Sequence, residues 1–262
     1  MFFITVGSDI PEISHKCMPS PDKSVYFNHI HHHCEILLFI SGHADYSIDG
    51  ELFRPSPYDL LFIPSGTYHY LIPTSHDPYE NYVIGIDPDR LSQVAYGKLF
   101  SPPYMLSIRD AQDIREFFVR LDTYHARYDA EDFLRMATLV IEELITHLCY
   151  RKEELRSVRS RNNAYIDRIV RYIAEHLEQE LDACRIAQAF HLSCSYVQNL
   201  FSEHMHIGLK SYIRQKKLFA ARGELLRGVS AREVCERYAF GDYSSFYRLY
   251  KKTYGVSPKD AK

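Results

Sequence analysis

The stretch "VSAREVCERYAFGDYSSFYRLYKKTYGVSP", residues 229–258, decides the fold of the C-terminal part of the chain. Ser230 and Glu233 have the spacing of a capping box, so we expect a short helix to begin after Ser230. Gly241-Asp242 ends that helix, and the Asp242 carboxylate can cap a second one by accepting from first-turn amides. Two helices joined by such a short turn predict a helix-turn-helix unit.

The same pattern occurs about 50 residues earlier, in "IAQAFHLSCSYVQNLFSEHM", residues 186–205. Asp182 can cap its short helix, His191-Leu192 form the turn, and Ser193 can cap the second helix. A long helical segment, about residues 208–227, connects the two units. One such pattern is a weak signal, whereas two in series predict an all-α DNA-binding domain over residues 164–262.

Charge is divided unevenly along the chain. Residues 1–155 hold 12 Lys and Arg against 23 Asp and Glu, and residues 156–262 hold 19 against 11. A basic C-terminal half favours contact with a polyanion, although clustered solvated charge would give the same count.

The C-terminal residues resemble a known family. The residues that match its signature are Ala239-Phe240, Asp242-Tyr243, Phe246, Arg248, Lys251-Lys252, Gly255 and Ser257-Pro258. Residues 165–259 resemble the DNA-binding domain of the AraC family of transcription regulators. The resemblance implies binding to double-stranded promoter or operator DNA, a small-molecule effector, a homodimer and contact with RNA polymerase.

Recognition helices present polar side chains at their N-terminal ends to the major groove. Gln198 and Asn199 carry amides that can bind adenine edges. Many relatives have arginine where Asn199 stands, which leaves guanine recognition there open, and Arg248 is assigned to a phosphate or a structural pair. The candidate DNA-binding residues are Ser195, Tyr196, Gln198, Asn199, Ser202, Tyr243, Ser244, Tyr247, Arg248, Lys251 and Lys252. The cations expected to neutralise phosphates, or else to lie on a solvated helix face, are Lys210, Arg214, Lys216 and Lys217.

The first 105 residues indicate β structure. Short apolar runs end at Gly42, Gly50 and Gly66, at intervals of roughly ten residues, which is typical of an antiparallel sandwich or barrel. Asp49-Gly50 is a favourable hairpin turn because both residues tolerate positive φ. Residues 1–105 also resemble the cupin-type β-barrel found in many AraC relatives, which implies an effector-binding domain.

Two segments carry the candidate effector site: "HIHHHCE", residues 29–35, and "IPSGTYH", residues 63–69. They are similar to the segments that supply three histidines and a glutamate in metal-binding cupins. The candidate effector-binding residues, and equally the candidate metal ligands, are His29, His31, Glu35 and His69. Imidazole nitrogens and a carboxylate suit a divalent metal. Three interpretations stay open: a metal-assisted effector site, a metal-free pocket for a polyhydroxylated ligand such as a sugar, and rim histidines without a ligand.

Residues 106–155 are predicted to form a helical hairpin, because apolar residues recur at helical spacing in both halves. Their apolar stripe either packs on the barrel or pairs with a second copy, and we expect dimerisation here. Residues 156–163 are basic and polar, which predicts a linker. Six scattered cysteines without a CxxC pair favour reduced thiols in a cytoplasmic protein, and no apolar run is long enough for a membrane span.

The predicted fold is therefore multidomain α+β: a cupin-like β-barrel, a helical hairpin and a tandem helix-turn-helix domain. The predicted function is sequence-specific transcription regulation by a chain that senses a small molecule, a sugar or related polar metabolite, and is not an enzyme. The alternative is a metal-dependent cupin dioxygenase or isomerase with a DNA-binding domain. Against it, Tyr58 stands where a glycine opens the second cupin motif, and Pro73 where an asparagine often closes it.

Overall fold

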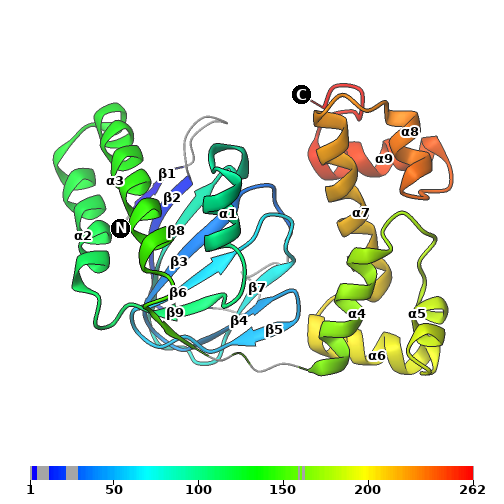
Figure 1. The fold of residues 1–262 in the computed structure, drawn as a ribbon, viewed down its shortest axis with the longest axis horizontal. Helices are drawn as coiled ribbons and strands as arrows, with labels where there is room; N and C mark the ends of the chain where they lie inside the picture. The colour runs from blue at the N-terminus through cyan, green and yellow to red at the C-terminus, as the bar shows by residue number, and fades with distance from the viewer. Residues whose placement is uncertain (1, 5–11, 22–28, 159, 161–162, 262) are drawn as a thin grey trace. The chain divides into compact units, whose positions relative to one another are not determined.

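The computed structural model describes residues 2–4, 12–21, 29–158, 160 and 163–261. The chain divides into two compact units, residues 1–161 and 162–262 (Figure 1). Within the described residues, the first is rich in β-strands and carries three α-helices, and the regular elements of the second are all helices. The predicted α+β fold class is confirmed. Each helix in the described ranges is too short or too polar to cross a lipid bilayer.

Two antiparallel sheets form the body of the first unit. Within the described residues, the larger sheet has the strand order β1-β2-β8-β3-β6-β9-β10, and the smaller has the order β5-β4-β7. The strands are β1 Phe2–Ile4, β2 Glu12–Met18, β3 Cys34–Ser41, β4 Ala44–Ile48, β5 Glu51–Phe53, β6 Asp59–Ile63, β7 His69–Pro73, β8 Tyr79–Ile86, β9 Met105–Ser107 and β10 Arg156–Ser157. Strand β10 pairs with β9 and includes the first two residues of the predicted linker, of which residues 159, 161 and 162 lie outside the described residues.

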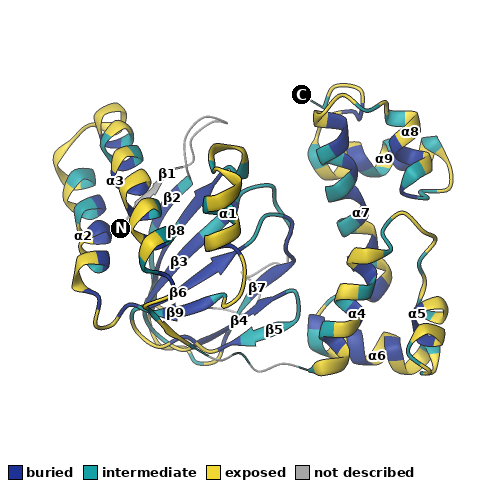
Figure 2. Ribbon diagram, in the orientation of Figure 1, coloured by how far each residue is buried: buried dark blue, intermediate teal, exposed yellow. Residues whose placement is uncertain are grey.

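Strand β3 has two buried faces, because successive side chains of a strand point to opposite sides of the sheet. Leu37 and Phe39 join the core between the two sheets. Ile36 and Leu38 join a second core, formed with the helices on the other side of the larger sheet. Figure 2 shows the resulting buried colour along β3, β6 and β8. The larger sheet is therefore a wall shared by two cores.

The turn between β4 and β5 is local in origin. Asp49 and Gly50 have φ values of 44° and 90°, and Ile48 pairs with Glu51 across the turn. Positive φ at both central residues defines the hairpin turn whose twist matches that of the strands. The predicted Asp49-Gly50 hairpin is confirmed.

Helices cover the outer side of the larger sheet. They are the short 3-10 helix η2 Pro88–Arg90, followed by α1 Gln93–Leu99, α2 Gln112–Arg127 and α3 Ala130–Arg151. Phe117 and Leu121 of α2 and Leu144 of α3 are buried in the same core as Ile36 and Leu38 of β3. Of the two roles predicted for the apolar stripe, packing on the barrel is the one observed. These apolar side chains are buried against the sheet and are not available to pack against a second copy of the chain.

The second unit consists of α4 Ala164–Glu175, α5 Ala183–Ala189, α6 Cys194–Met205, α7 Leu209–Leu226, α8 Ala231–Arg237 and α9 Tyr243–Tyr254. The predicted caps are confirmed: side chains of Asp182, Ser193, Ser230 and Asp242 each accept from a backbone amide in the first turn of their helices. Such caps satisfy amides that have no partner within the helix.

The two turns have matching geometry. His191 and Ala239, at equivalent positions, both have positive φ, at 55° and 49°. After each of them the chain turns back, so that Leu192 N donates to Ala187 O at 2.8 Å and Phe240 N donates to Cys235 O at 3.1 Å. The pairs α5–α6 and α8–α9 are therefore two copies of one helix-turn-helix, joined by α7.

Lys217 of α7 corrects one prediction. It is 6% exposed, and its ammonium donates to Gln179 O at 2.7 Å and to Tyr238 O at 2.8 Å. Gln179 precedes α5 and Tyr238 follows α8, so one buried side chain ties both helix-turn-helix units to α7. Burial lowers the pKa of Lys217. This lysine cannot neutralise a phosphate, because the two helix-turn-helix units enclose its side chain.

A disulfide corrects a second prediction. Cys184, in the first turn of α5, is bonded to Cys194, the first residue of α6, with a Cα–Cα distance of 4.7 Å. The expectation of reduced thiols is therefore wrong for this pair. Cys17, Cys34, Cys149 and Cys235 are free thiols. The bond joins the starts of the two helices of the first helix-turn-helix, where the sequence shows no CxxC motif.

Candidate functional site

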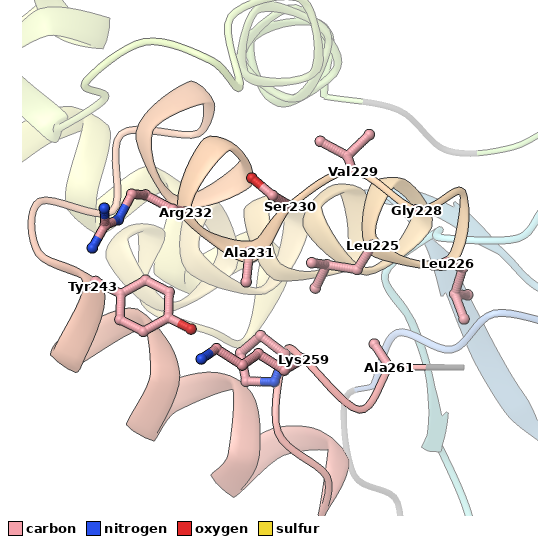
Figure 3. Close-up of a pocket in the computed structure, with 11 residues that line it drawn as sticks. Leu225, Leu226, Gly228, Val229, Ser230, Ala231, Arg232, Tyr243, Lys259 and Ala261 are labelled. Carbon is pink, nitrogen blue, oxygen red and sulfur yellow. The ribbon is translucent and has the colours of Figure 1, made fainter.

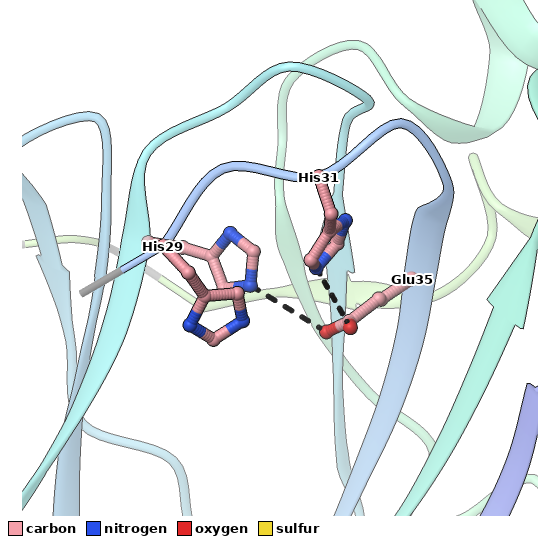
Figure 4. A group of neighbouring side chains, drawn as sticks. His29, His31 and Glu35 are labelled. Atoms are coloured by element: carbon pink, nitrogen blue, oxygen red, sulfur yellow. Dashed lines mark ion pairs between the residues drawn. The ribbon is translucent and has the colours of Figure 1, made fainter. Parts of the chain in front are cut away.

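The four candidate effector and metal residues lie together at one end of the barrel (Figure 4). One side-chain ligand atom from each of His29, His31, Glu35 and His69 lies within 4.8 Å of the others. His29 and His69 also exchange backbone hydrogen bonds of 3.2 and 3.3 Å, which hold residue 29 against the start of β7. Glu35 enters from β3, so three separate segments meet here. We refer to these four side chains as the cradle.

Backbone carbonyls fix the proton on two of the cradle imidazoles. His31 Nδ1 lies 2.8 Å from His33 O, and His69 Nδ1 lies 3.0 Å from Thr67 O. A carbonyl oxygen only accepts, so each of these Nδ1 atoms carries a proton, and both Nε2 atoms face inward. Both Nε2 atoms are buried; that of His69 has no hydrogen-bond partner, and that of His31 faces the Glu35 carboxylate. Metal-binding histidines have this arrangement, in which a second group holds the other ring nitrogen.

Glu35 supplies the negative charge of the cradle. Its Oε1 lies 3.0 Å from His31 Nε2, and its Oε2 lies 3.8 Å from His69 Nε2. Burial opposes ionisation, but the His31 and His33 imidazoles outweigh it and hold the pKa of Glu35 well below its usual range. Burial lowers the pKa of His69 to about 4. A carboxylate facing two inward imidazole nitrogens is an arrangement that a cation stabilises.

His33 belongs to the same cluster, although it was not among the four candidate residues. Its ring stacks on His31 with centroids 3.7 Å apart, and its Nε2 lies 3.3 Å from Glu35 Oε1. Gly85 of β8 makes room for it, because a Cβ there would come within 2.9 Å of the His33 ring. Residues 31, 33 and 35 share a period of two, and this signal could have placed His33 inward.

The cradle opens into a cavity of about 360 Å³ between the two sheets. Its lining includes residues that no local motif identifies: Glu12, Lys16, Tyr46, Tyr79, Asn81 and Val83. These come from β2, β4 and β8, which sheet pairing brings to the same cavity. Sequence reasoning missed them because strand register is a non-local property.

The outer face of the same strands is tied to α2. His15 of β2 lies between two carboxylates, with Nδ1 2.8 Å from Asp122 of α2 and Nε2 2.8 Å from Glu80 of β8. Its ring stacks on Tyr82, whose hydroxyl donates to Asp122. Strands β2 and β8 therefore line the cavity on one face and bind a helix on the other.

In α6 the predicted residues all lie on the exposed face. Ser195, Tyr196, Gln198, Asn199 and Ser202 are all exposed. The opposite face is buried through Val197, Leu200, Phe201 and Met205. The N-terminal half of α6 therefore presents a polar surface with two carboxamides, the chemistry that reads base edges in a major groove.

In α9 the predicted residues divide into two groups. Ser244, Arg248, Lys251 and Lys252 are exposed, whereas Tyr243 and Tyr247 are half-buried. Tyr243 lines a cavity of about 660 Å³ at the end of α7 and the start of α8, together with Val229, Ala231 and Lys259 (Figure 3). The exposed face of α9 is thus more basic than that of α6, which suits contact with phosphates.

Comparison with known proteins identifies both parts of the chain. Residues 20–143 match the model of the AraC-like ligand binding domain, and residues 186–262 match a helix-turn-helix domain. The chain belongs to the AraC family.

Similar curated proteins share part of this AraC-family chain. "Uncharacterized HTH-type transcriptional regulator YijO" of Escherichia coli (strain K12) is 30% identical over 47% of this chain and 44% of its own length. The "XylDLEGF operon transcriptional activator" of Pseudomonas putida is 29% identical over 40% of this chain and 34% of its own. The "HTH-type transcriptional activator RhaS" of Salmonella schwarzengrund (strain CVM19633) is 27% identical over 42% and 40%. This chain thus spans less than half the length of each of these relatives.

Among solved structures, ToxT from Vibrio cholerae matches 96% of this chain and 97% of its own, with 10% identity and a TM-score of 0.40. The C-terminal domain of AraT, a response regulator from Geobacillus stearothermophilus, matches 38% of this chain and 84% of its own, with 23% identity and a TM-score of 0.36.

Proposed function

We propose that this protein is a sequence-specific, DNA-binding transcription regulator whose barrel binds a small-molecule effector. The observation that carries the proposal is the pair of matching helix-turn-helix units on α7, with polar exposed residues at the start of α6. A recognition helix needs this combination of a buried apolar face and a polar N-terminal face.

The length and bracing of α7 support binding to successive major grooves on one side of the duplex. Its 18 residues span about 27 Å, close to the roughly 34 Å between such grooves. Lys217 holds both units to this helix. Gln198 and Asn199 would read bases, and Arg248, Lys251 and Lys252 would position the protein on phosphates.

The cradle fits a divalent transition metal. Two imidazoles whose Nδ1 atoms are held by backbone carbonyls, a third histidine and an ionised glutamate supply nitrogen and carboxylate ligands in a buried setting. We assign His29, His31, Glu35 and His69 as its ligands. A bound cation would offer a Lewis-acidic attachment point for an effector, and the residues around it would orient and enclose that molecule.

The contacts of α2 support a route by which the effector acts. The inner face of β2 and β8 lines the cavity, and their outer face holds Asp122 through His15 and Tyr82. A ligand that shifts these strands would move α2. We further propose a homodimer through the exposed parts of the hairpin, where Val119 and Leu139 are 61% and 60% exposed, together with contact to RNA polymerase and a cytoplasmic location.

Binding-site selection with the purified full chain tests the DNA-binding proposal. We expect selected sequences with two half-sites about 10 base pairs apart. Gln198→Ala or Asn199→Ala should relax sequence preference at one position each, whereas Gln188→Ala, an exposed amide on α5, should change nothing. Selection that returns random sequence would overturn the proposal, and a monomer in sedimentation with and without DNA would overturn the dimer.

Elemental analysis tests the cradle. The chain should hold one metal per protomer, and His31→Ala or His69→Ala should lose most of it, while His43→Ala, an exposed loop histidine paired with Asp77, keeps it. The cradle also favours the alternative function, a cupin oxygenase with a DNA-binding domain. Oxygen consumption by the iron-loaded chain would support that alternative, and its absence together with effector-dependent DNA binding supports the regulator.

A further inference from the structure

The cavity behind the cradle has two polar ends and an apolar middle. The cradle forms one end. Asn81 of β8 and Lys16 of β2, whose Cα positions pair in the sheet, line the other. Leu37 and Val83, which pair with each other, lie in the lining between them, and Ile63 lies beside Glu35. A ligand that fills this space must change character along its length.

Strand register gives the distance between the two ends. Glu35 pairs with Gly85, and Asn81 lies four residues before Gly85 on the same strand. At about 3.3 Å per residue, these positions are about 13 Å apart. Residues 81, 83 and 85 point to the same side of the sheet because their spacing is two. The cavity therefore suits a small, elongated molecule, in keeping with a volume near the lower limit of roughly 300–1,000 Å³ for ligand pockets.

The far end carries an unsatisfied acceptor. Asn81 is 5% exposed and lines the cavity, and its Oδ1 has no hydrogen-bond partner. A buried carbonyl oxygen without a donor is unfavourable, so native proteins seldom leave one unless a ligand or water completes it. A ligand hydroxyl would donate to Asn81 Oδ1 and could still accept from the Lys16 ammonium.

The middle of the cavity disfavours a sugar. The side chains of Leu37 and Val83, and of Ile63 next to the cradle, offer neither donors nor acceptors, so each ligand hydroxyl against them would lose its water without a replacement. An aromatic ring or a short hydrocarbon chain of similar length would bury apolar surface there instead. These apolar side chains thus select against ligand polar groups that contact them, and the two polar ends select for a polar group at each end of the ligand.

We propose that the effector is a small amphipathic molecule with a metal-chelating head in the cradle, an apolar body about the size of one benzene ring, and a hydroxyl that donates to Asn81. The assignment of the chelating head depends on the metal cradle of the proposed function. The assignment of the body and the hydroxyl depends on Leu37, Ile63, Val83 and Asn81, which are not ligands in the cradle.

Calorimetric titration of the cobalt-loaded full chain tests this proposal with three hydroxamates. Acetohydroxamate has the chelating head alone, benzohydroxamate adds the ring, and 4-hydroxybenzohydroxamate adds the far hydroxyl. We expect about a tenfold gain in affinity from the ring, since it replaces a methyl group with a larger apolar surface. A further gain of about fivefold to tenfold should come from the hydroxyl. D-xylose should not compete with any of them.

The variant Asn81→Leu separates the far end from the rest of the cavity. It should remove the advantage of the 4-hydroxyl group while leaving benzohydroxamate affinity and the visible cobalt spectrum unchanged, and that spectrum also shows that the variant is folded. Equal affinity for all three hydroxamates, or competition by D-xylose, would overturn the inference and leave the cradle intact. Failure to take up cobalt would overturn the cradle itself and, with it, the proposed head.

Discussion

Lys217→Met should lower the unfolding free energy of the second unit without changing the number of DNA phosphates that this unit neutralises. Methionine keeps most of the side-chain volume but removes the ammonium that donates to Gln179 O and Tyr238 O. A hydrogen bond to a charged group contributes roughly 1.5–3 kcal/mol, so the two bonds contribute about 3–6 kcal/mol. Burial also disfavours the charged form of Lys217 and lowers its pKa, and this cost of desolvation offsets part of the gain from the two bonds. We therefore expect a net loss of about 2–4 kcal/mol.

Lys210→Met is the matched control, because Lys210 is exposed near the start of the same helix. Urea unfolding followed by circular dichroism should show the loss of stability in Lys217→Met and almost none in Lys210→Met. Titration of operator DNA at several salt concentrations should show the reverse. Lys210→Met should reduce the slope of log affinity against log salt by about 0.9 if Lys210 neutralises one phosphate, and Lys217→Met should leave the slope unchanged.

Two results would refute the reasoning. Equal unfolding midpoints for both variants would show that the two carbonyls do not depend on Lys217. A reduced salt slope in Lys217→Met would show that its ammonium reaches DNA, as a solvated lysine would.

Three further predictions concern other parts of the chain. Lys152 is buried, and its ammonium donates to two backbone carbonyls. Burial lowers the pKa of Lys152 from its ordinary value of 10.5 to about 8. Between about pH 8 and 10.5 the unfolded chain therefore binds more protons than the native chain. Stability should therefore rise across that interval, by up to about 3 kcal/mol, in urea unfolding of the wild type, and this rise should be absent in Lys152→Met. Cys184→Ser, or reduction of the bond to Cys194, should lower the unfolding free energy of the helical unit by about 3 kcal/mol, a loss that vanishes if wild type and variant are compared under reducing conditions. Gly85→Ala should displace the His33 ring and lower metal affinity by about tenfold in a chelator competition, and unchanged affinity would show that His33 does not support the cradle.

Local signals predicted the parts of the fold that depend on neighbouring residues. The caps at Ser193 and Asp242 and the turn at Asp49-Gly50 each need only a few consecutive residues, and the structure confirms them. The cradle residues could be nominated because three of them lie within seven positions of one another. Their proximity to His69 followed from resemblance to a family rather than from spacing.

The remaining features depend on contacts between distant segments. Lys217 lies in a helix rich in cations, and only the packing of the two helix-turn-helix units around α7 encloses it. Cys184 and Cys194 are ten residues apart, and the turn between α5 and α6 brings their Cα atoms to 4.7 Å. Asn81 came from a strand without a motif, and the pairing of β8 with β2 and β3 places it in the cavity. A sequence pattern cannot reveal such positions before the register is known.

The alternation along β3 separates two kinds of evolutionary change. Glu35 and Leu37 contact the cavity, whereas Ile36 and Leu38 pack under the helical hairpin. A substitution at an odd position can alter which molecule fits while the packing beneath the hairpin stays the same. A substitution at an even position acts on stability and leaves the ligand chemistry alone. Single changes at Glu35 or Leu37 could therefore alter what the barrel detects while the packing beneath the helical hairpin stays in place.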